Sequence, residues 1–319
     1  MLINWQPSAS LAVLKKRAEL LKKIREFMAV RDILEVETPI MNHAGNTEPN
    51  LNSFTSQFHS PSSTEPQRLY LQTSPEFAMK RLLAAGSGPI FQIARVFRDR
   101  EQGSHHQPEF TMLEWYRTGY DHHALMDEMG ELLLELGFKS PVRASYTSVF
   151  ESATGIDPHQ GATSLLQDKA ASLGLQGDEN DRPVLLDFLF SSLVAPELGR
   201  GKPMFIYDFP SCQAALSRIR EGEPPLAERF ELFIEGVEIA NGFNELCDAD
   251  EQQRRFELEN LYRRQHNLPE VPVDRRLLAA LEQGLPDSAG VALGIDRLLM
   301  VILGYDSIDK VVTFTFNQA

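Results

Sequence analysis

Two apolar segments joined by a polar one constrain the fold of this chain more than any other feature. Residues 90–97 alternate like a β-strand, and residues 109–116 form a second segment of this kind. The residues between them, 98–108, are polar and charged. The pattern predicts an antiparallel hairpin with an unusually long loop, and long loops in compact domains are often functional.

One face of this hairpin carries side chains that suit binding. Alternate residues of a strand share a face, which groups Phe110, Glu114 and Tyr116 on the second strand. On the first strand, Arg98 shares a face with Gln92. An aromatic ring, a carboxylate and a phenol beside an arginine pack poorly but make a good binding floor. A half-exposed sheet surface is the alternative, and the pattern alone does not separate the two.

The remaining segments indicate an α+β fold, an antiparallel sheet flanked by helices, because strands joined by hairpins alternate with blocks of helix. We expect a single domain over residues 1–319, with helical insertion material at about 120–225, and a long surface loop at 43–68. Ser74-Pro75 has the sequence of a helix start, with Gly86 past its end. Further helices are expected at 8–32, 121–137, 181–194, 250–265 and 295–303, and strands at 33–36, 69–71, 230–239, 243–246, 290–294 and 311–316.

Asn241-Gly242 is the strongest short hairpin signal in the chain. If these two residues form the turn, Glu238 lies directly opposite Glu245. Facing carboxylates repel each other unless a cation lies between them, and oxygen ligands suit Mg²⁺. The alternative is a pair of solvent-facing glutamates on an edge hairpin.

Arg297 is expected in the first turn of a helix, where a positive charge opposes the helix dipole. A residue placed against local preference hints at function: the arginine would meet phosphate, and Gly294 would let a nucleotide approach the backbone. Tight packing is the alternative reading of the glycine. For His105 and His106 we expect solvent-exposed loop positions, since no further metal ligands follow at a suitable spacing.

Charge and composition exclude several classes of protein. Lys and Arg number 31 against 45 Asp and Glu, and the formal charge of −14 argues against a non-specific nucleic-acid binder. No apolar run approaches the ~20 residues of a membrane helix, so we expect no membrane partner. The two cysteines, Cys212 and Cys247, fit ordinary buried thiols in a reducing cytoplasm.

Four motifs, in order along residues 8–303, resemble those of class II aminoacyl-tRNA synthetases of the lysine-specific kind. Val96-Phe97-Arg98 with residues 108–116 resembles motif 2, and residues 290–297 resemble motif 3. The first helix with Val36-Glu-Thr-Pro39 resembles motif 1. Residues 227–233 and 238–245 resemble the family's metal and substrate strand. The resemblance implies a class II catalytic core, and motif 1 implies a homodimer.

The chain also departs from lysyl-tRNA synthetases. Motif 1 begins near residue 8, which leaves no room for an anticodon-binding barrel, and Ala292 stands where the synthetases have glycine. These features resemble the short paralogues that attach (R)-β-lysine to elongation factor P. That resemblance implies ATP-dependent activation of (R)-β-lysine to an aminoacyl-adenylate, transfer to a lysine ε-amine of the factor, and no stable tRNA binding.

The resemblance assigns roles to the matched residues. Arg98 and Arg297 would act catalytically on the phosphates, and Glu238 and Glu245 would hold Mg²⁺, with Glu245 also near the amino acid. The other substrate residues would be Ser74 and Glu76 at the backbone amine, Glu114 and Tyr116 at the far amine, and Ala292 at the pocket wall. The other ATP contacts would be Phe110 stacked on adenine, together with Asp99, Arg100, Gln107, Ile239 and Gly294. Arg100 stands where the family has a glutamate, which leaves Glu101 and the main chain as alternatives for the adenine contact.

Three other functions remain open. A free-standing lysine-activating synthetase fragment would carry the same motifs. An amino-acid-metabolic enzyme of the same fold, such as an ammonia-using asparagine synthetase, is disfavoured by Glu114 and Tyr116, since aspartate calls for cations there. A non-catalytic regulatory subunit is disfavoured because the arginine and glutamate set is intact.

Overall fold

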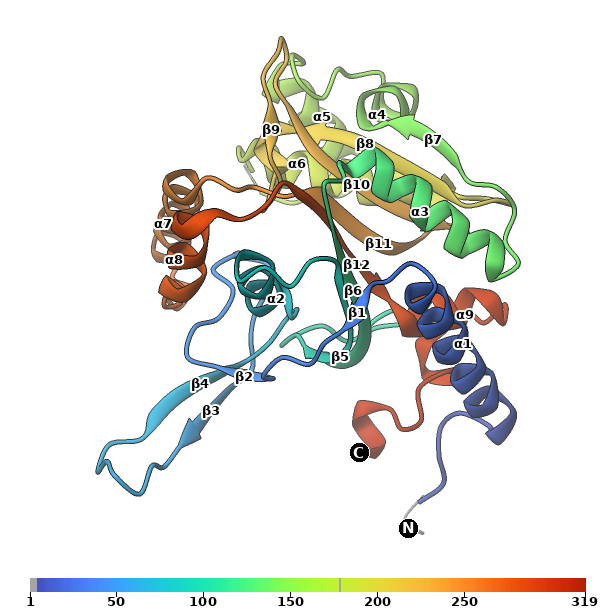
Figure 1. Ribbon diagram of the computed structural model, residues 1–319. Coiled ribbons are helices and arrows are strands. Elements are labelled where there is room, and N and C mark those ends of the chain that lie inside the picture. Colours follow the sequence, from blue (N-terminus) through green and yellow to red (C-terminus); the bar gives the residue numbers. More distant parts are fainter. Residues whose placement is uncertain (1–4, 178) are drawn as a thin grey trace. The chain divides into compact units, whose positions relative to one another are not determined.

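The computed structural model describes residues 5–177 and 179–319 of the protein, which form two compact units (Figure 1). Unit 1 comprises Met1–Gly119, Cys247–Ser288 and Ala292–Ala319, and unit 2 comprises Tyr120–Leu246 and Ala289–Val291. Strand β12 (Ser288–Gly294) contributes residues to both. Among the described residues, no helix combines the length and the apolar character needed to cross a membrane.

The hairpin predicted from the sequence is the centre of unit 1. Strand β5 (Ile90–Phe97) pairs antiparallel with β6 (Glu109–Thr118), in a register that runs from Ile90 opposite Tyr116 to Phe97 opposite Glu109. The amide of Arg98 donates to the carbonyl of Pro108 at 2.8 Å and closes the long loop. A short strand, β1 (Leu34–Glu35), pairs parallel with β5, an arrangement that the sequence pattern did not predict.

Most helices of unit 1 begin close to where the sequence predicts, but the helix over residues 275–284 was not predicted. Helix α1 (Leu11–Ala29) has Ser10 as its N-cap, and Val13, Leu20, Ile24 and Phe27 are among the residues it buries. Helix α2 (Glu76–Ala84) packs against α8 (Arg275–Gly284). Its first turn is held by the Ser74 hydroxyl, which accepts from the amide of Glu76 at 3.0 Å. The remaining helices are α7 (Ala249–Gln265) and α9 (Ile295–Ile302).

Two expectations about unit 1 are wrong. The long loop predicted at 43–68 contains β3 (Thr55–Phe58), which pairs with β4 (Gln67–Leu71), and β4 also pairs with β2 (Met41–Asn42). All four residues of β3 are exposed, so no alternation of apolar and polar residues signals the strand. The strand expected at 311–316 is absent, and short 3₁₀ turns, η4 (Ile308–Lys310) and η5 (Phe316–Gln318), occupy this part of the chain.

Unit 2 is a mixed sheet covered by helices. Its strands lie in the order β11 (Val237–Asn244), β10 (Leu226–Ile234), β8 (Met204–Pro210) and β7 (Val142–Ser145), and β9 (Ile219–Arg220) also pairs with β10. The helices and short helical turns are α3 (His122–Glu135), α4 (Tyr146–Thr154), α5 (Thr163–Ser172), α6 (Arg182–Leu189), η1 (Phe190–Val194), η2 (Ala195–Glu197) and η3 (Ser211–Gln213). The region 120–225 contains these helices and also supplies strands β7, β8 and β9.

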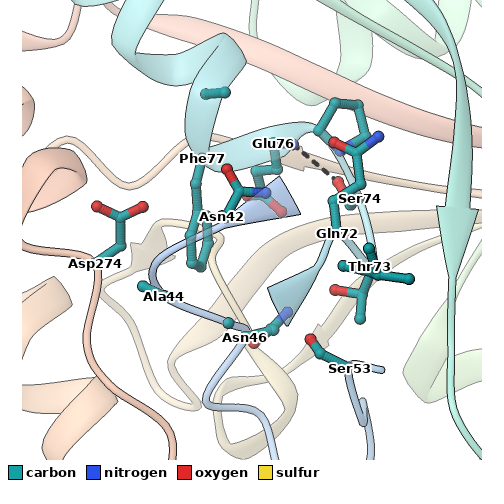
Figure 2. Close-up of a pocket in the computed structure, with 14 residues that line it drawn as sticks. Asn42, Ala44, Asn46, Ser53, Gln72, Thr73, Ser74, Glu76, Phe77 and Asp274 are labelled. Atoms are coloured by element: carbon teal, nitrogen blue, oxygen red, sulfur yellow. Dashed lines mark hydrogen bonds between the residues drawn. The ribbon is translucent and has the colours of Figure 1, made fainter. Parts of the chain in front are cut away.

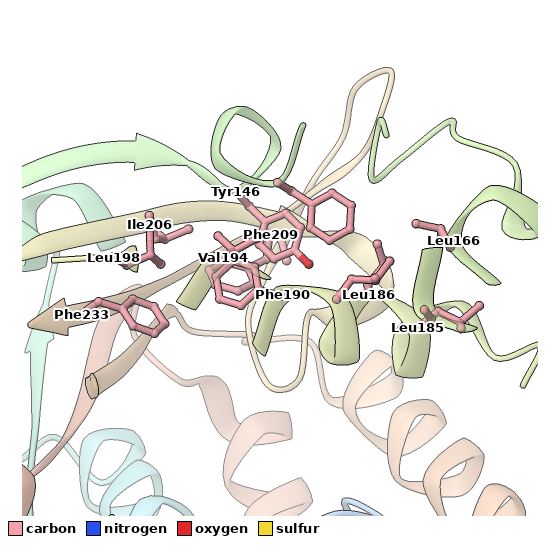
Figure 3. Packing of buried hydrophobic residues seen from close by; sticks show 14 of the residues in the cluster. Tyr146, Leu166, Leu185, Leu186, Phe190, Val194, Leu198, Ile206, Phe209 and Phe233 are labelled. Atoms are coloured by element: carbon pink, nitrogen blue, oxygen red, sulfur yellow. The ribbon is translucent and has the colours of Figure 1, made fainter. Parts of the chain in front are cut away.

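An aromatic cluster forms the core of unit 2 (Figure 3). The ring of Tyr146 stacks on that of Phe190 with centroids 4.9 Å apart, and it lies 4.9 Å from the ring of Phe209 at a tilt. These rings come from α4, η1 and β8, so the cluster joins the inserted helices to the sheet.

The turn predicted at Asn241-Gly242 is wrong. The β10–β11 hairpin turns at Glu235-Gly236, where φ is +52° and +78°, and Gly242 lies inside β11 opposite Phe230. A Cβ at Gly242 would lie 2.5 Å from the Phe230 ring, so close packing rather than a turn requires glycine there. Glu238 pairs with Phe233 and does not face Glu245, so the argument for a metal from facing carboxylates fails.

Candidate active site

The carboxylate of Glu114 is held by two hydroxyl groups in unit 1. The Ser74 hydroxyl donates to Oε2 and the Tyr116 hydroxyl to Oε1, each at 2.7 Å. Glu114 and Tyr116 lie on one face of β6, as the alternation predicts, and each is 2% exposed. The structure therefore brings together three residues that the sequence assigned to amino-acid binding, around a fixed anionic group.

Glu76, the fourth of these residues, has an internal counter-ion. Its Oε1 lies 2.7 Å from Nζ of Lys80, one helical turn further along α2, and Lys80 is 1% exposed. Sequence reasoning missed Lys80, although a lysine four residues after a glutamate in the same helix was the available signal. Figure 2 shows Ser74, Glu76 and Phe77 around a small pocket whose lining also includes Asp274.

Arg98 leaves β5 beside an aromatic ring. Its guanidinium carbon lies 5.2 Å from the ring centroid of Phe110, within the range of a cation–π interaction. Its Nε donates to the carbonyl of Thr73 at 3.4 Å, next to Ser74. Phe110 and Ala292 pack at the edge of a small cluster formed by Ala94, Val96 and Met112. A cation, an aromatic face and the predicted pocket-wall residue thus belong to one side of unit 1.

Arg297 is held by the hairpin loop. Its Nε donates to the carbonyl of His105 at 3.1 Å, and its guanidinium lies 2.6 Å from Nε2 of His106. His106 is an exposed loop residue, as predicted, whereas His105 is half-buried. Both also contact Arg297, which the sequence did not predict, His105 through its backbone carbonyl and His106 through its ring. Burial and the Arg297 charge lower the pKa of His105. Contacts over such a separation in sequence leave no local signal.

Asp296 fixes the first turn of α9 by its contacts with β6 and α1. One carboxylate oxygen accepts from the amide of Thr111 on β6 at 2.7 Å, and the other is paired with Arg17 of α1. Arg17 also donates to the Thr111 hydroxyl at 2.7 Å. This buried network joins the three segments that resemble motifs 1, 2 and 3, and it fixes the start of the helix that carries Gly294 and Arg297.

The other predicted ATP residues of unit 1 differ in their surroundings. Gln107 uses both ends of its amide on the C-terminal segment, donating to Asp309 at 2.7 Å and accepting from the amide of Phe316 at 3.0 Å. Asp99 accepts from the amide of Arg100 at 2.9 Å, and Arg100 is exposed with φ +69°. A nucleotide contact of these three residues stays a prediction.

Glu238, Ile239 and Glu245 belong to unit 2. Ile239 is buried, and Glu245, just after β11, is 1% exposed and forms an isolated bridge with Ser217. Burial raises the pKa of neighbouring Glu231 to about 7, against the nearby charge of Arg229 and with a contribution from Glu238. Carboxylate oxygens are the ligands that Mg²⁺ prefers, but Glu238 and Glu245 are separated by seven residues of extended strand, roughly 20 Å, and cannot hold one ion together. The carboxyl groups of Glu231 and Glu238 are close enough for their charges to interact.

Comparison with known proteins shows the family of this chain. The family of class II tRNA synthetases (D, K and N) matches residues 2–318. A protein of Vibrio cholerae named elongation factor P--(R)-beta-lysine ligase is 51% identical over 320 residues, which cover 99% of each chain. Proteins of the same name from Histophilus somni and Pseudoalteromonas translucida are 49% and 50% identical, over 99% of this chain and 98% of theirs.

These matches confirm the fold class predicted from the motifs, α+β with a sheet flanked by helices. The family match extends over nearly the whole sequence, and the relatives align along almost their full length. The chain belongs to the class II tRNA synthetase family, in the group that contains the D, K and N enzymes.

Proposed function

We propose that this protein is an ATP-dependent, AMP-forming ligase that activates (R)-β-lysine and transfers it to a lysine ε-amine of elongation factor P. The observation that carries the proposal is the buried carboxylate of Glu114, fixed by Ser74 and Tyr116. A buried anion with fixed geometry suits an ammonium group of a diamino acid. The name shared by the full-length relatives supports the same substrates.

The reaction has two steps with simple atom balance. An oxygen of the amino-acid carboxylate attacks the α-phosphorus of ATP. The bond between this phosphorus and the oxygen that bridges it to the β-phosphate breaks, and pyrophosphate leaves. The acceptor amine then attacks the acyl carbon, an amide forms, and AMP leaves with the bonding electron pair. Arg98 and Arg297 would neutralise charge on the phosphates, and Phe110 would stack on the adenine.

Glu238 would hold Mg²⁺ together with Glu231, since their carboxyl groups are close enough for their charges to interact, and the ion would neutralise phosphate charge when bound. Glu245 lies too far along the strand to share this ion.

We also propose a homodimer formed through the motif 1 region. Large apolar side chains are exposed around α1 and the segment after it: Leu11, Val30, Leu34, Ile40 and Met41. Exposed apolar side chains in this number along one stretch of the chain favour a partner surface. The acceptor is a translation factor, so we expect the reaction in the cytoplasm and no stable binding of tRNA. Sedimentation at micromolar concentration tests the dimer.

Pyrophosphate exchange with (R)-β-lysine, α-lysine and aspartate tests the activation step. We expect exchange with (R)-β-lysine above that with α-lysine and none with aspartate. Mass spectrometry of elongation factor P after incubation with ATP and (R)-β-lysine tests the transfer. Exchange with aspartate alone would support the amino-acid-metabolic alternative, and absence of exchange with all three would support a non-catalytic role.

A further inference from the structure

Two adjacent histidines and an aspartate meet in unit 2, outside every segment that resembles a synthetase motif. His122 and His123 begin α3, and Asp208 lies in β8 (Figure 1). One donor atom from each of the three side chains lies within 4.8 Å of the other two. Nε2 of His122 is 3.6 Å from Oδ1 of Asp208, and the two imidazole centroids are 4.1 Å apart.

We propose that His122, His123 and Asp208 bind a divalent transition-metal ion of the Zn²⁺ type. Two imidazoles and one carboxylate are a common protein donor set for zinc, with water as the fourth ligand. Two donors at zinc bond lengths of about 2.1 Å in a tetrahedron lie roughly 3.4 Å apart, close to the separation of the His122 and Asp208 atoms. Small side-chain rotations would bring the third donor into range.

The hydrogen bonding of His122 is the second observation that points to a ligand. His122 is 1% exposed, and neither of its ring nitrogens has a hydrogen-bond partner among the described residues. The same is true of Oδ1 of Asp208 within that part of the chain. Buried polar atoms are nearly always satisfied, and a metal ion bound to Nε2 and Oδ1 would satisfy both at once.

The surroundings prepare these groups for a metal. Nη2 of Arg220 donates to Oδ2 of Asp208 at 2.8 Å, which orients the carboxylate and leaves Oδ1 toward the histidines. The second ring, His123, is half-buried beside His122 and faces Tyr207 of β8, with the ring centroids 5.3 Å apart. Arg143 also acts on His123 as a nearby positive charge, and Asp121 as a negative one.

Asp208 occupies an irregular point of the sheet. Its φ is +59°, and the pairing of β8 with β10 shifts between Phe209 opposite Ala227 and Tyr207 opposite Phe230. Aspartate and asparagine tolerate this left-handed conformation better than most residues. Bound metal would join this point of β8 to the first turn of α3, and so stabilise unit 2 rather than take part in the ligase reaction.

The test uses the untagged full-length protein, treated with chelator and titrated with Zn²⁺ by calorimetry in excess Mg²⁺, which occupies oxygen-only sites. We expect one Zn²⁺ per chain, a rise in the unfolding temperature on binding, and the visible spectrum of tetrahedral Co²⁺ when Co²⁺ replaces Zn²⁺. D208N keeps the backbone preference and removes the charge, and H123A removes a partly exposed ring. Each should weaken binding at least ~10-fold.

H59A removes an exposed histidine of unit 1 and is the matched control, which should bind like the wild type. Circular dichroism without metal checks that the variants fold, and H123A retains the test if D208N does not fold. The proposal is overturned if the wild type binds neither Zn²⁺ nor Co²⁺ with a dissociation constant below ~100 µM. It is also overturned if folded H123A binds Zn²⁺ as tightly as the wild type.

Discussion

Nζ of Lys80 lies 2.7 Å from Oε1 of Glu76, so a carboxylate that the sequence assigns to the substrate already carries a buried counter-ion. Glu76 is the first residue of α2 and lies two residues after Ser74, which donates to the Glu114 carboxylate. The charge of Glu76 is thus balanced before any ligand binds, and an incoming ammonium would share the carboxylate with Lys80.

Replacing Lys80 with methionine should destabilise the protein by ~3–5 kcal/mol, because it leaves the Glu76 charge buried without this partner. The double variant E76Q/K80M should recover part of that loss, since neither charge remains. Denaturant unfolding of the four proteins in the cycle measures both effects. Additive losses would mean that the two side chains do not interact energetically.

Replacing Glu114 with glutamine should impair use of the amino acid far more than that of ATP. The substitution removes a charge-assisted contact worth ~2–3 kcal/mol, so kcat/KM for (R)-β-lysine should fall roughly 30- to 150-fold. The variant Y116F removes only one donor to this carboxylate and should lose less. An equal rise of the KM for ATP in E114Q would show that Glu114 is wrongly placed in the amino-acid site.

Replacing Ala292 with glycine should raise activation of α-lysine relative to (R)-β-lysine. Ala292 packs beside Phe110 at the edge of the Ala94, Val96 and Met112 cluster, and one methyl group in a pocket discriminates by ~1–3 kcal/mol. Pyrophosphate exchange with each isomer measures the ratio. An unchanged ratio with normal ATP use would assign Ala292 to packing alone.

The stability of the protein should fall between about pH 5 and pH 7 because of Glu259. Burial raises the pKa of this carboxyl to about 7, while Thr47 donates a hydrogen bond to it. The folded state therefore keeps a proton that the unfolded state loses near pH 4.5, and raising the pH favours unfolding. Relative to the wild type, E259Q should gain about 3 kcal/mol over this range.

Thermal unfolding at pH 5 and pH 7.5 compares the two proteins. A constant difference in unfolding temperature across the range would show that Glu259 titrates normally.

The parts of the fold that the sequence predicts well are those with a repeating local pattern. The β5–β6 hairpin is predicted because the apolar alternation of both strands is long and the pairing is direct. Glu114 and Tyr116 are grouped on one face for a similar reason, since alternate residues of a strand point the same way. Ser74 was assigned to the substrate only by the family resemblance, because its contact with Glu114 joins segments 40 residues apart.

The errors arise where tertiary packing decides. Gly242 is glycine because the Phe230 ring lies against it, and Asn-Gly therefore mimics a turn signal inside a strand. Glu-Gly, the sequence of the actual turn at residues 235–236, is a weaker turn signal than Asn-Gly. Likewise, the contacts of His105 and His106 with Arg297 form between distant segments, and the exposed residues of β3 carry no apolar periodicity.

The loop 98–108 begins at Arg98 and carries, near its other end, the two histidines that hold Arg297. It is closed at its base by the hydrogen bond from Arg98 to Pro108. The loop therefore links the strand end that carries Arg98 to the guanidinium of Arg297. A one-residue insertion within it would disturb the contacts that orient Arg297, so the length of this loop, as much as its composition, would matter for the phosphate binding that we propose.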